Sequence, residues 1–105
     1  MAIMVQELSV ARQTLQQLGG HRFITMTGAH TLVGHPDALS FNLPSRFARD
    51  GINYVKITLT PMDVYHMEFG RVWRGKYTVK ATKESVYNDN LQTVFSRITG
   101  LNTHL

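Results

Sequence analysis

The residues in this sequence best suited to a chemical role are basic side chains gathered in one stretch of the second half. Five of the 11 Lys and Arg residues fall between positions 71 and 83, and no acidic residue interrupts them. Clustered cations bind phosphates, and single-stranded nucleic acid also stacks its bases on aromatic rings. The stretch and its neighbours predict a nucleic-acid-binding surface made of Tyr54, Lys56, Arg71, Trp73, Arg74, Lys76, Lys80 and Lys83.

The same residues have a simpler interpretation as the solvated face of a sheet. Lys and Thr are common on exposed strands, where charge discourages edge-to-edge aggregation, and a net charge of +4 is ordinary for a small domain. A dedicated RNA platform carries several aromatic residues on its middle strands, whereas the predicted face has only Tyr54. Trp73 between Arg71 and Arg74 has the composition of a protein-interface hot spot, but a tryptophan also commonly folds back onto a core.

Histidines and carboxylates provide weaker candidates. His30 and His35 lie near Asp37 in a predicted polar connection, but a metal site needs several converging ligands, which this spacing does not supply. His66 and Glu68 are two residues apart on a predicted strand, so they share a face where a His–carboxylate pair could orient a general base. Because that face is predicted to be open and perturbed catalytic pairs belong in clefts, we favour surface residues over an enzyme site.

Several kinds of chemistry are excluded by the residues present. The chain has no cysteine, which excludes disulfides, thiol nucleophiles and cysteine-bound zinc. Neither G-x-G-x-x-G nor G-x-x-x-x-G-K-[ST] occurs, and Gly19-Gly20 follows a predicted helix, whereas a phosphate-binding loop precedes one. No serine has the G-x-S-x-G setting of a nucleophile. We therefore expect a non-catalytic protein with no catalytic residues, no bound metal and no cofactor.

The first half of the chain predicts a helix followed by short strands. Gly19-Gly20 ends the helix, whose apolar stripe at three- and four-residue spacing is Val5, Leu8, Ala11, Leu15 and Leu18. The segment from His21 to Thr27 is rich in β-branched and aromatic residues and predicts a strand. Further strands are expected around 31–33 and over 38–43, and one helical turn within 45–50.

The second half predicts an antiparallel meander followed by a second amphipathic helix, from Asn88 to Gly100. Residues 54–60, 64–69 and 76–82 alternate between apolar and polar, and Arg74-Gly75 marks the tip of the last hairpin. The alternation predicts a core side that includes Tyr77, Val79 and Ala81. The polar side is predicted to face water and carries Lys56, Thr58, Thr60, His66, Glu68, Lys76, Thr78 and Lys80.

Together these elements predict a single α+β domain over residues 1–105. Its antiparallel sheet has five or six strands, with an N-terminal and a C-terminal helix packed on one face. The longest apolar run, Met1 to Val5, is far too short to span a membrane, and the N-terminus lacks the basic and long apolar regions of a secretory signal. We therefore expect a cytoplasmic protein that makes no contact with membranes.

Five ordered blocks of the sequence resemble a family of small uncharacterised proteins encoded by bacteriophages and prophages. The likeness covers most of the chain, and its blocks are Gln13–Gly20, Phe23–Ala29, Gly51–Ile57, Glu68–Arg71 and Lys76–Val79. The resemblance implies a phage or prophage origin and hence action in the cytoplasm of a bacterial host cell. It implies no activity and no site residues.

Two functions of different classes are compatible with these observations. The first is a phage-type accessory protein that binds nucleic acid through a basic sheet face and hairpin. The alternative is a protein-interaction factor that binds and modulates a bacterial host or defence protein, with Trp73 and the hairpin as its anchor. Small domains with an exposed sheet edge also pair with themselves, and a homodimer would double the basic footprint.

Overall fold

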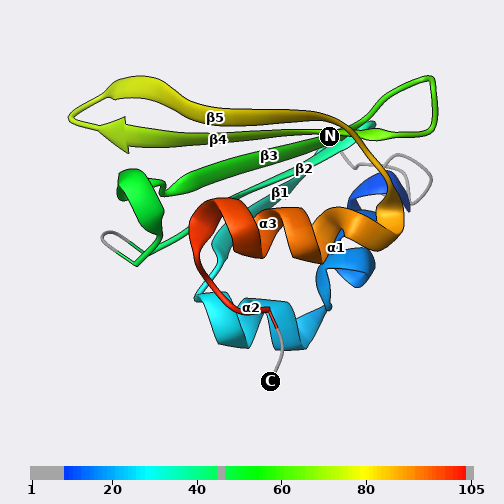
Figure 1. The fold of residues 1–105 in the computed structure, drawn as a ribbon, viewed down its shortest axis with the longest axis horizontal. Coiled ribbons are helices and arrows are strands. Elements are labelled where there is room, and N and C mark those ends of the chain that lie inside the picture. The colour runs from blue at the N-terminus through cyan, green and yellow to red at the C-terminus, as the bar shows by residue number, and fades with distance from the viewer. Residues whose placement is uncertain (1–8, 45–46, 104–105) are drawn as a thin grey trace, which may run out of the picture.

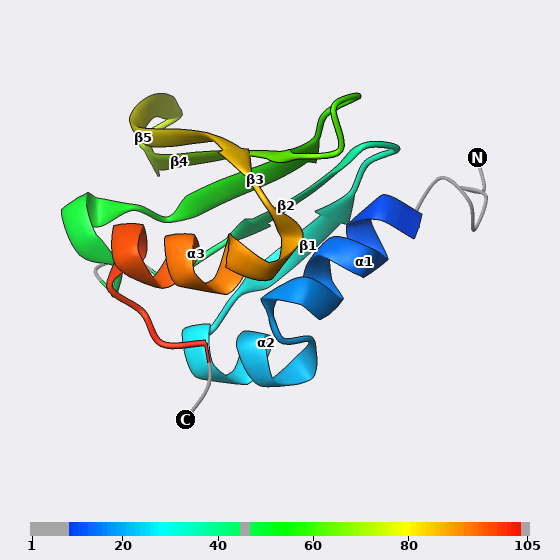
Figure 2. The same cartoon turned by 45° about the vertical axis from the view of Figure 1, so that its right-hand side comes forward.

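Five antiparallel strands form one sheet, and three helices of the described chain pack on one side of it in the computed structural model (Figures 1 and 2). The structure describes residues 9–44 and 47–103. The strands lie across the sheet in chain order as β1 (His30–Gly34), β2 (Ala38–Asn42), β3 (Tyr54–Leu59), β4 (Tyr65–Trp73) and β5 (Lys76–Val86). The helical elements are α1 (Ser9–Leu18), α2 (His21–Thr27), η2 (Arg49–Gly51), η3 (Asn88–Asn90) and α3 (Leu91–Thr99). The predicted α+β class is confirmed.

Most predicted elements are present in the described chain. The N-terminal helix is α1, and the first part of its predicted stripe, Val5 and Leu8, lies outside the described residues, as does the run from Met1. The helical turn expected within 45–50 is present as η2, although positions 45 and 46 are also outside them. No helix among the described residues is long and apolar enough to cross a membrane.

The segment His21–Thr27 forms helix α2, so the strand predicted there is wrong. Phe23 and Thr27 are both buried and lie four residues apart, on one face of the helix. Thr27 Oγ1 donates a hydrogen bond of 2.7 Å to the carbonyl oxygen of Phe23, and Gly28 ends the helix with a left-handed φ of 74°. The β-branched residues favour a strand only weakly, and packing of Phe23 into the core overrides that preference.

Four phenylalanine rings from four different elements form the centre of the core. Phe23 of α2 meets Phe41 of β2 edge-on at 5.3 Å and Phe95 of α3 at 5.1 Å between ring centroids. Phe69 of β4 lies 6.4 Å from Phe95. All four side chains are fully buried. The core therefore holds α2 and α3 against the same side of the sheet.

The β4–β5 hairpin extends beyond the rest of the sheet. β4 and β5 have 9 and 11 residues, whereas β3 has 6, and the last β3–β4 pair joins Tyr54 to Gly70. Residues 71–73 therefore pair with 76–78 alone, and the tip projects past α3 (Figure 1). Arg74 and Gly75 at the tip both have positive φ, 52° and 76°, as a two-residue type I′ turn requires. The predicted hairpin tip is confirmed.

Phe95→Ala should lower the free energy of unfolding by about 3–5 kcal/mol, because it removes the ring that contacts three others and leaves a cavity. Phe47→Ala is the matched control, since the Phe47 side chain is 66% exposed and its loss should change stability by about 0.5 kcal/mol or less. Urea denaturation followed by circular dichroism measures both. Equal effects of the two substitutions would contradict the position of Phe95 at the centre of the core.

Candidate functional site

One extra residue in β5 decides which side chains lie on each side of the hairpin. Phe69 pairs with Ala81 but Gly70 pairs with Val79, so Lys80 has no partner of its own on β4. Such a β-bulge shifts the alternation of the strand by one residue. Toward the tip, Tyr77 and Val79 therefore lie on the open side of the sheet, away from the helices.

The predicted placement of the basic residues on one open face is therefore wrong. Tyr54 and Lys56 of β3 lie on the open side, where Lys56 pairs across the strands with Glu68. The bulge places Lys76 and Thr78 on the other side of the hairpin, which faces η2 and α3. The eight predicted residues are thus split between two surfaces, and their proposed role in binding nucleic acid stays a prediction.

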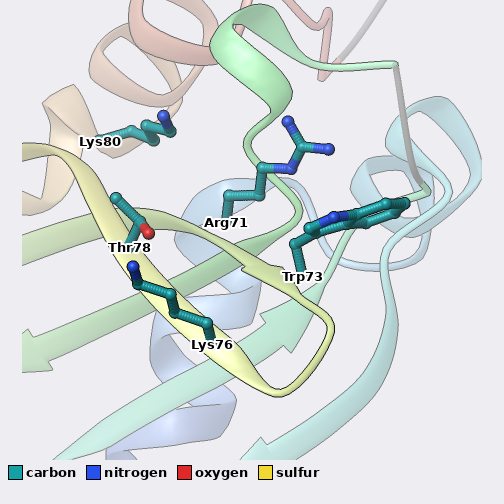
Figure 3. Close-up of a pocket in the computed structure, with 5 residues that line it drawn as sticks. All are labelled: Arg71, Trp73, Lys76, Thr78 and Lys80. Carbon is teal, nitrogen blue, oxygen red and sulfur yellow. The ribbon is translucent and has the colours of Figure 1, made fainter.

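On the helix-facing side of the hairpin, basic residues line a hollow of about 280 Å³. Its walls are Arg71 and Trp73 from β4 together with Lys76, Thr78 and Lys80 from β5. Figure 3 shows these five side chains on one side of the hairpin, with the Arg71 guanidinium pointing toward the neighbouring η2. The hollow brings together four of the predicted residues.

Trp73 holds two arginines beside each other at the mouth of this hollow. The guanidinium carbon of Arg71 lies 5.0 Å from the centroid of the indole, and that of Arg74 lies 5.4 Å from it. Both distances suit cation–π attraction, which offsets part of the repulsion between the two cations. Arg71 also packs against η2, where a Cβ added to Gly51 would be 3.1 Å from its Nη1. Trp73 itself remains 52% exposed.

The side chain of Asn53 fixes the base of the hairpin. Its Nδ2 donates to the carbonyl oxygen of Val72 at 3.0 Å, and the Val72 N–H donates to its Oδ1 at 2.8 Å. The Asn53 N–H also donates to the carbonyl oxygen of Gly70 at 2.9 Å. The amide thus extends the β3–β4 pairing by one step and sets the direction in which the hairpin projects. No pattern in the sequence marked Asn53 for this role.

A second hollow of about 260 Å³ follows further along β5, where the strand meets α3. Lys83 and Arg97 line it with the polar side chains of Ser85, Asn90 and Thr93. Lys83 is thus close to α3 rather than in the group around Trp73. Arg97 in the last turn of α3 adds a cation from a distant part of the chain, a contribution that the sequence did not predict.

These cations are not neutralised within the described part of the protein. Among the described residues, the single ion pair joins His66 Nδ1 to Glu84 Oε1 at 3.8 Å, on the other side of the sheet. No acidic side chain of the described chain lines either hollow. Lys76, Lys80 and Lys83 are exposed, and Arg71 is half-buried. The helix-facing side of the hairpin therefore presents uncompensated positive charge.

The open side of the hairpin is different in character. Tyr77 packs edge-on against Tyr54 at 5.5 Å, and its hydroxyl donates to Glu68 Oε2 at 2.8 Å. Burial raises the pKa of the Tyr77 phenol, and the hydrogen bond to Glu68 raises it further. The ring lies directly over Gly70, where an added Cβ would collide with it. Beside it, Val72 and Val79 are 43% and 50% exposed, so the open side is largely apolar here.

The candidate His66–Glu68 pair, which we interpreted as two surface residues, is not formed. Both residues lie on the open side as expected, but Glu68 accepts from Tyr77 and His66 pairs with Glu84. The other candidate histidines bond to hydroxyl groups: His30 Nδ1 lies 3.1 Å from Thr31 Oγ1, and His35 Nε2 lies 3.1 Å from Ser40 Oγ. In residues 9–44 and 47–103, no group of three or more His, Asp or Glu residues could hold a metal ion.

Comparison of the chain with protein-family models, with curated proteins and with solved structures finds no match. The resemblance to phage-encoded proteins therefore stays a prediction, and the site is interpreted from its own geometry.

Gly70→Ala should lower the free energy of unfolding by about 1–2 kcal/mol, because a methyl group there displaces the Tyr77 ring from Tyr54 and Glu68. Urea denaturation measures the loss. In a protein that already carries Tyr77→Ala, Gly70→Ala should lower the free energy of unfolding by less than half as much, because the Tyr77 ring is no longer there to be displaced. The same cost in both backgrounds would show that the collision with Tyr77 is not its cause.

Proposed function

We propose that this protein binds nucleic acid through the helix-facing side of its β4–β5 hairpin. The observation that carries the proposal is the uncompensated group of Arg71, Arg74, Lys76 and Lys80 around the exposed Trp73. Phosphate groups of a nucleic-acid backbone are the common ligand that needs several separate cations at once. The role is that of a non-catalytic accessory protein in the bacterial cytoplasm, the setting implied by the resemblance to phage proteins.

The geometry supports binding over simple solvation in two respects. A basic side chain that only keeps a strand soluble extends freely into water. Arg71 does not, because it is held between Trp73 and the backbone of η2. Ordering a long side chain costs conformational entropy. Because Arg71 is already held in place in the free protein, binding of a ligand does not carry that cost. The bulge and the Asn53 contacts likewise fix the direction of the hairpin before any ligand arrives.

Lys76→Gln with Lys80→Gln should weaken binding of a mixed set of single- and double-stranded oligonucleotides and reduce its salt dependence. Two lost phosphate contacts should reduce the slope of log affinity against log salt by about 1.4–1.8. Fluorescence anisotropy at low and moderate salt measures it. Arg12→Gln with Lys56→Gln is the control, because it removes the same charge from α1 and from the open side of the sheet.

If Arg12→Gln with Lys56→Gln lost as much affinity as Lys76→Gln with Lys80→Gln, net charge alone would attract nucleic acid. The proposed surface would then be wrong. No binding by the unaltered protein even at low salt would reject the proposal as a whole.

The alternative function, binding of a bacterial protein, has its own support on the opposite side of the hairpin. Val72, Tyr77 and Val79 are 43%, 40% and 50% exposed next to one another, although two of them were expected in the core. Neighbouring exposed apolar side chains on a projecting element are typical of a protein-interaction surface. A host or defence protein would bind there, leaving the basic side free.

Val72→Ser with Val79→Ser separates the two functions. If a protein partner binds the open side, this variant should recover less of one specific protein from nuclease-treated bacterial lysate than the unaltered chain does. Its affinity for oligonucleotides should stay unchanged, because the cations lie on the other side. Recovery of the same proteins by both chains would exclude the open side as an interface.

A further inference from the structure

We infer that the nucleic acid bound by the hairpin is single-stranded, with one base stacked on Trp73 and the backbone following β5 toward α3. This inference rests on the proposed function and makes it specific. Three separate features of the described chain support it: the exposed indole, the position of the cations beside η2 and the order of the two hollows along β5.

The indole of Trp73 is placed to receive a base. It is 52% exposed, and it stands at the edge of a hollow whose other walls are Arg71, Lys76, Thr78 and Lys80. A base stacked on an aromatic ring beside arginines gains dispersion and cation–π energy, and every base has a face that can stack. Bases of a duplex stack on one another, so only an unpaired base can use the ring.

The cations lie together on one side of the hairpin, beside η2, where a flexible strand can follow them more closely than a stiff duplex can. They lie on the side of the hairpin that faces η2, and Gly51 of η2 approaches the Arg71 guanidinium closely. Figure 3 shows the Arg71 guanidinium pointing toward η2. A duplex is wide and stiff, with a persistence length of about 150 base pairs, so it cannot bend to follow the cations into the hollow. A single strand can bend into the hollow.

The two hollows give such a strand a path. The first ends at Lys80, and the second begins three residues further along β5 at Lys83, where Arg97 of α3 adds another cation. Lys76 and Lys83 pair with Trp73 and Met67, which are six residues apart on β4, and this corresponds to about 20 Å along a strand with a rise of roughly 3.3 Å per residue. That length spans several nucleotides, and the cations along it could meet successive phosphates.

The sequence contains one tryptophan and four tyrosines, so fluorescence excited at a wavelength that tyrosine does not absorb reports on Trp73 alone. The full chain is titrated at low salt with three polyanions. They are an oligothymidylate, a self-complementary DNA stem-loop with the same number of nucleotides, and inorganic polyphosphate, which has no bases. A length of about 12 nucleotides lies within the site sizes of small single-strand-binding folds. We expect the oligothymidylate to bind most tightly and to quench the fluorescence, and the other two to leave it nearly unchanged.

Labelled oligothymidylate then tests the ring itself. Trp73→Ala should weaken its binding about tenfold, while Trp73→Phe, which keeps an aromatic face, should stay within about threefold. In Trp73→Ala, polyphosphate binding should weaken clearly less than oligothymidylate binding, because polyphosphate loses only the support that the ring gives to Arg71 and Arg74, whereas the oligothymidylate also loses the stacking surface for a base. Because the hairpin projects from the core, circular dichroism should show all three chains folded alike.

The outcomes distinguish the inference from the proposed function. Tighter binding of the duplex, or binding of the oligothymidylate without quenching, would overturn the single-strand inference and leave the proposed function in place. Equal loss of polyphosphate binding in Trp73→Ala would reduce Trp73 to a support for the arginines and would also overturn it. No binding of any of the three polyanions would overturn both.

Discussion

The pairing of β4 with β5 is interrupted by two β-bulges, and the character of both sides of the projecting hairpin depends on the bulge at Lys80. Without Lys80 as an unpaired position, Tyr77 and Val79 would turn toward the helices, and Lys76 and Thr78 would face water. With it, the hairpin has a basic side near α3 and an apolar side on the open face. The offset brings Tyr77 onto the side of Glu68, and it brings Lys76 and Thr78 beside Arg71 and Trp73, which share a side because they lie two residues apart on β4.

The hairpin combines a fixed base with an exposed tip. Asn53 supplies two hydrogen bonds to Val72 where the β3 ladder has ended, and Gly70 leaves room for the Tyr77 ring over the strand. Beyond this point β4 and β5 pair with each other, and the Arg71 side chain contacts both Trp73 and Gly51 of η2. Because it projects from the sheet, such a hairpin can contact a ligand away from the core. The few contacts at its base fix its position, which lowers the entropy lost on binding.

Much of the fold was predictable from the sequence, and the errors have local physical causes. Alternation placed Val55, Ile57 and Met67 in the core correctly, because β3 and β4 are regular where they pair with each other. Alternation failed in β5, since a bulge without glycine leaves no mark in the residue pattern. It also failed for the seven residues of α2, where tertiary packing decided between helix and strand. The contributions of Asn53 and Arg97 depend on contacts between distant segments, which no local pattern contains.

The order of the strands has a consequence for how the chain reaches this structure. Each strand of the sheet pairs with the one before it in sequence, so the sheet can form by closing short loops one after another. The helices are different: Gln92 of α3 donates a hydrogen bond of 2.7 Å to the carbonyl oxygen of Leu18, 74 residues away. Bringing α1 and α3 together therefore carries the largest loop-closure entropy among these contacts. The rate of folding should accordingly be set by the junction of the two helices, far from the hairpin that we propose binds nucleic acid.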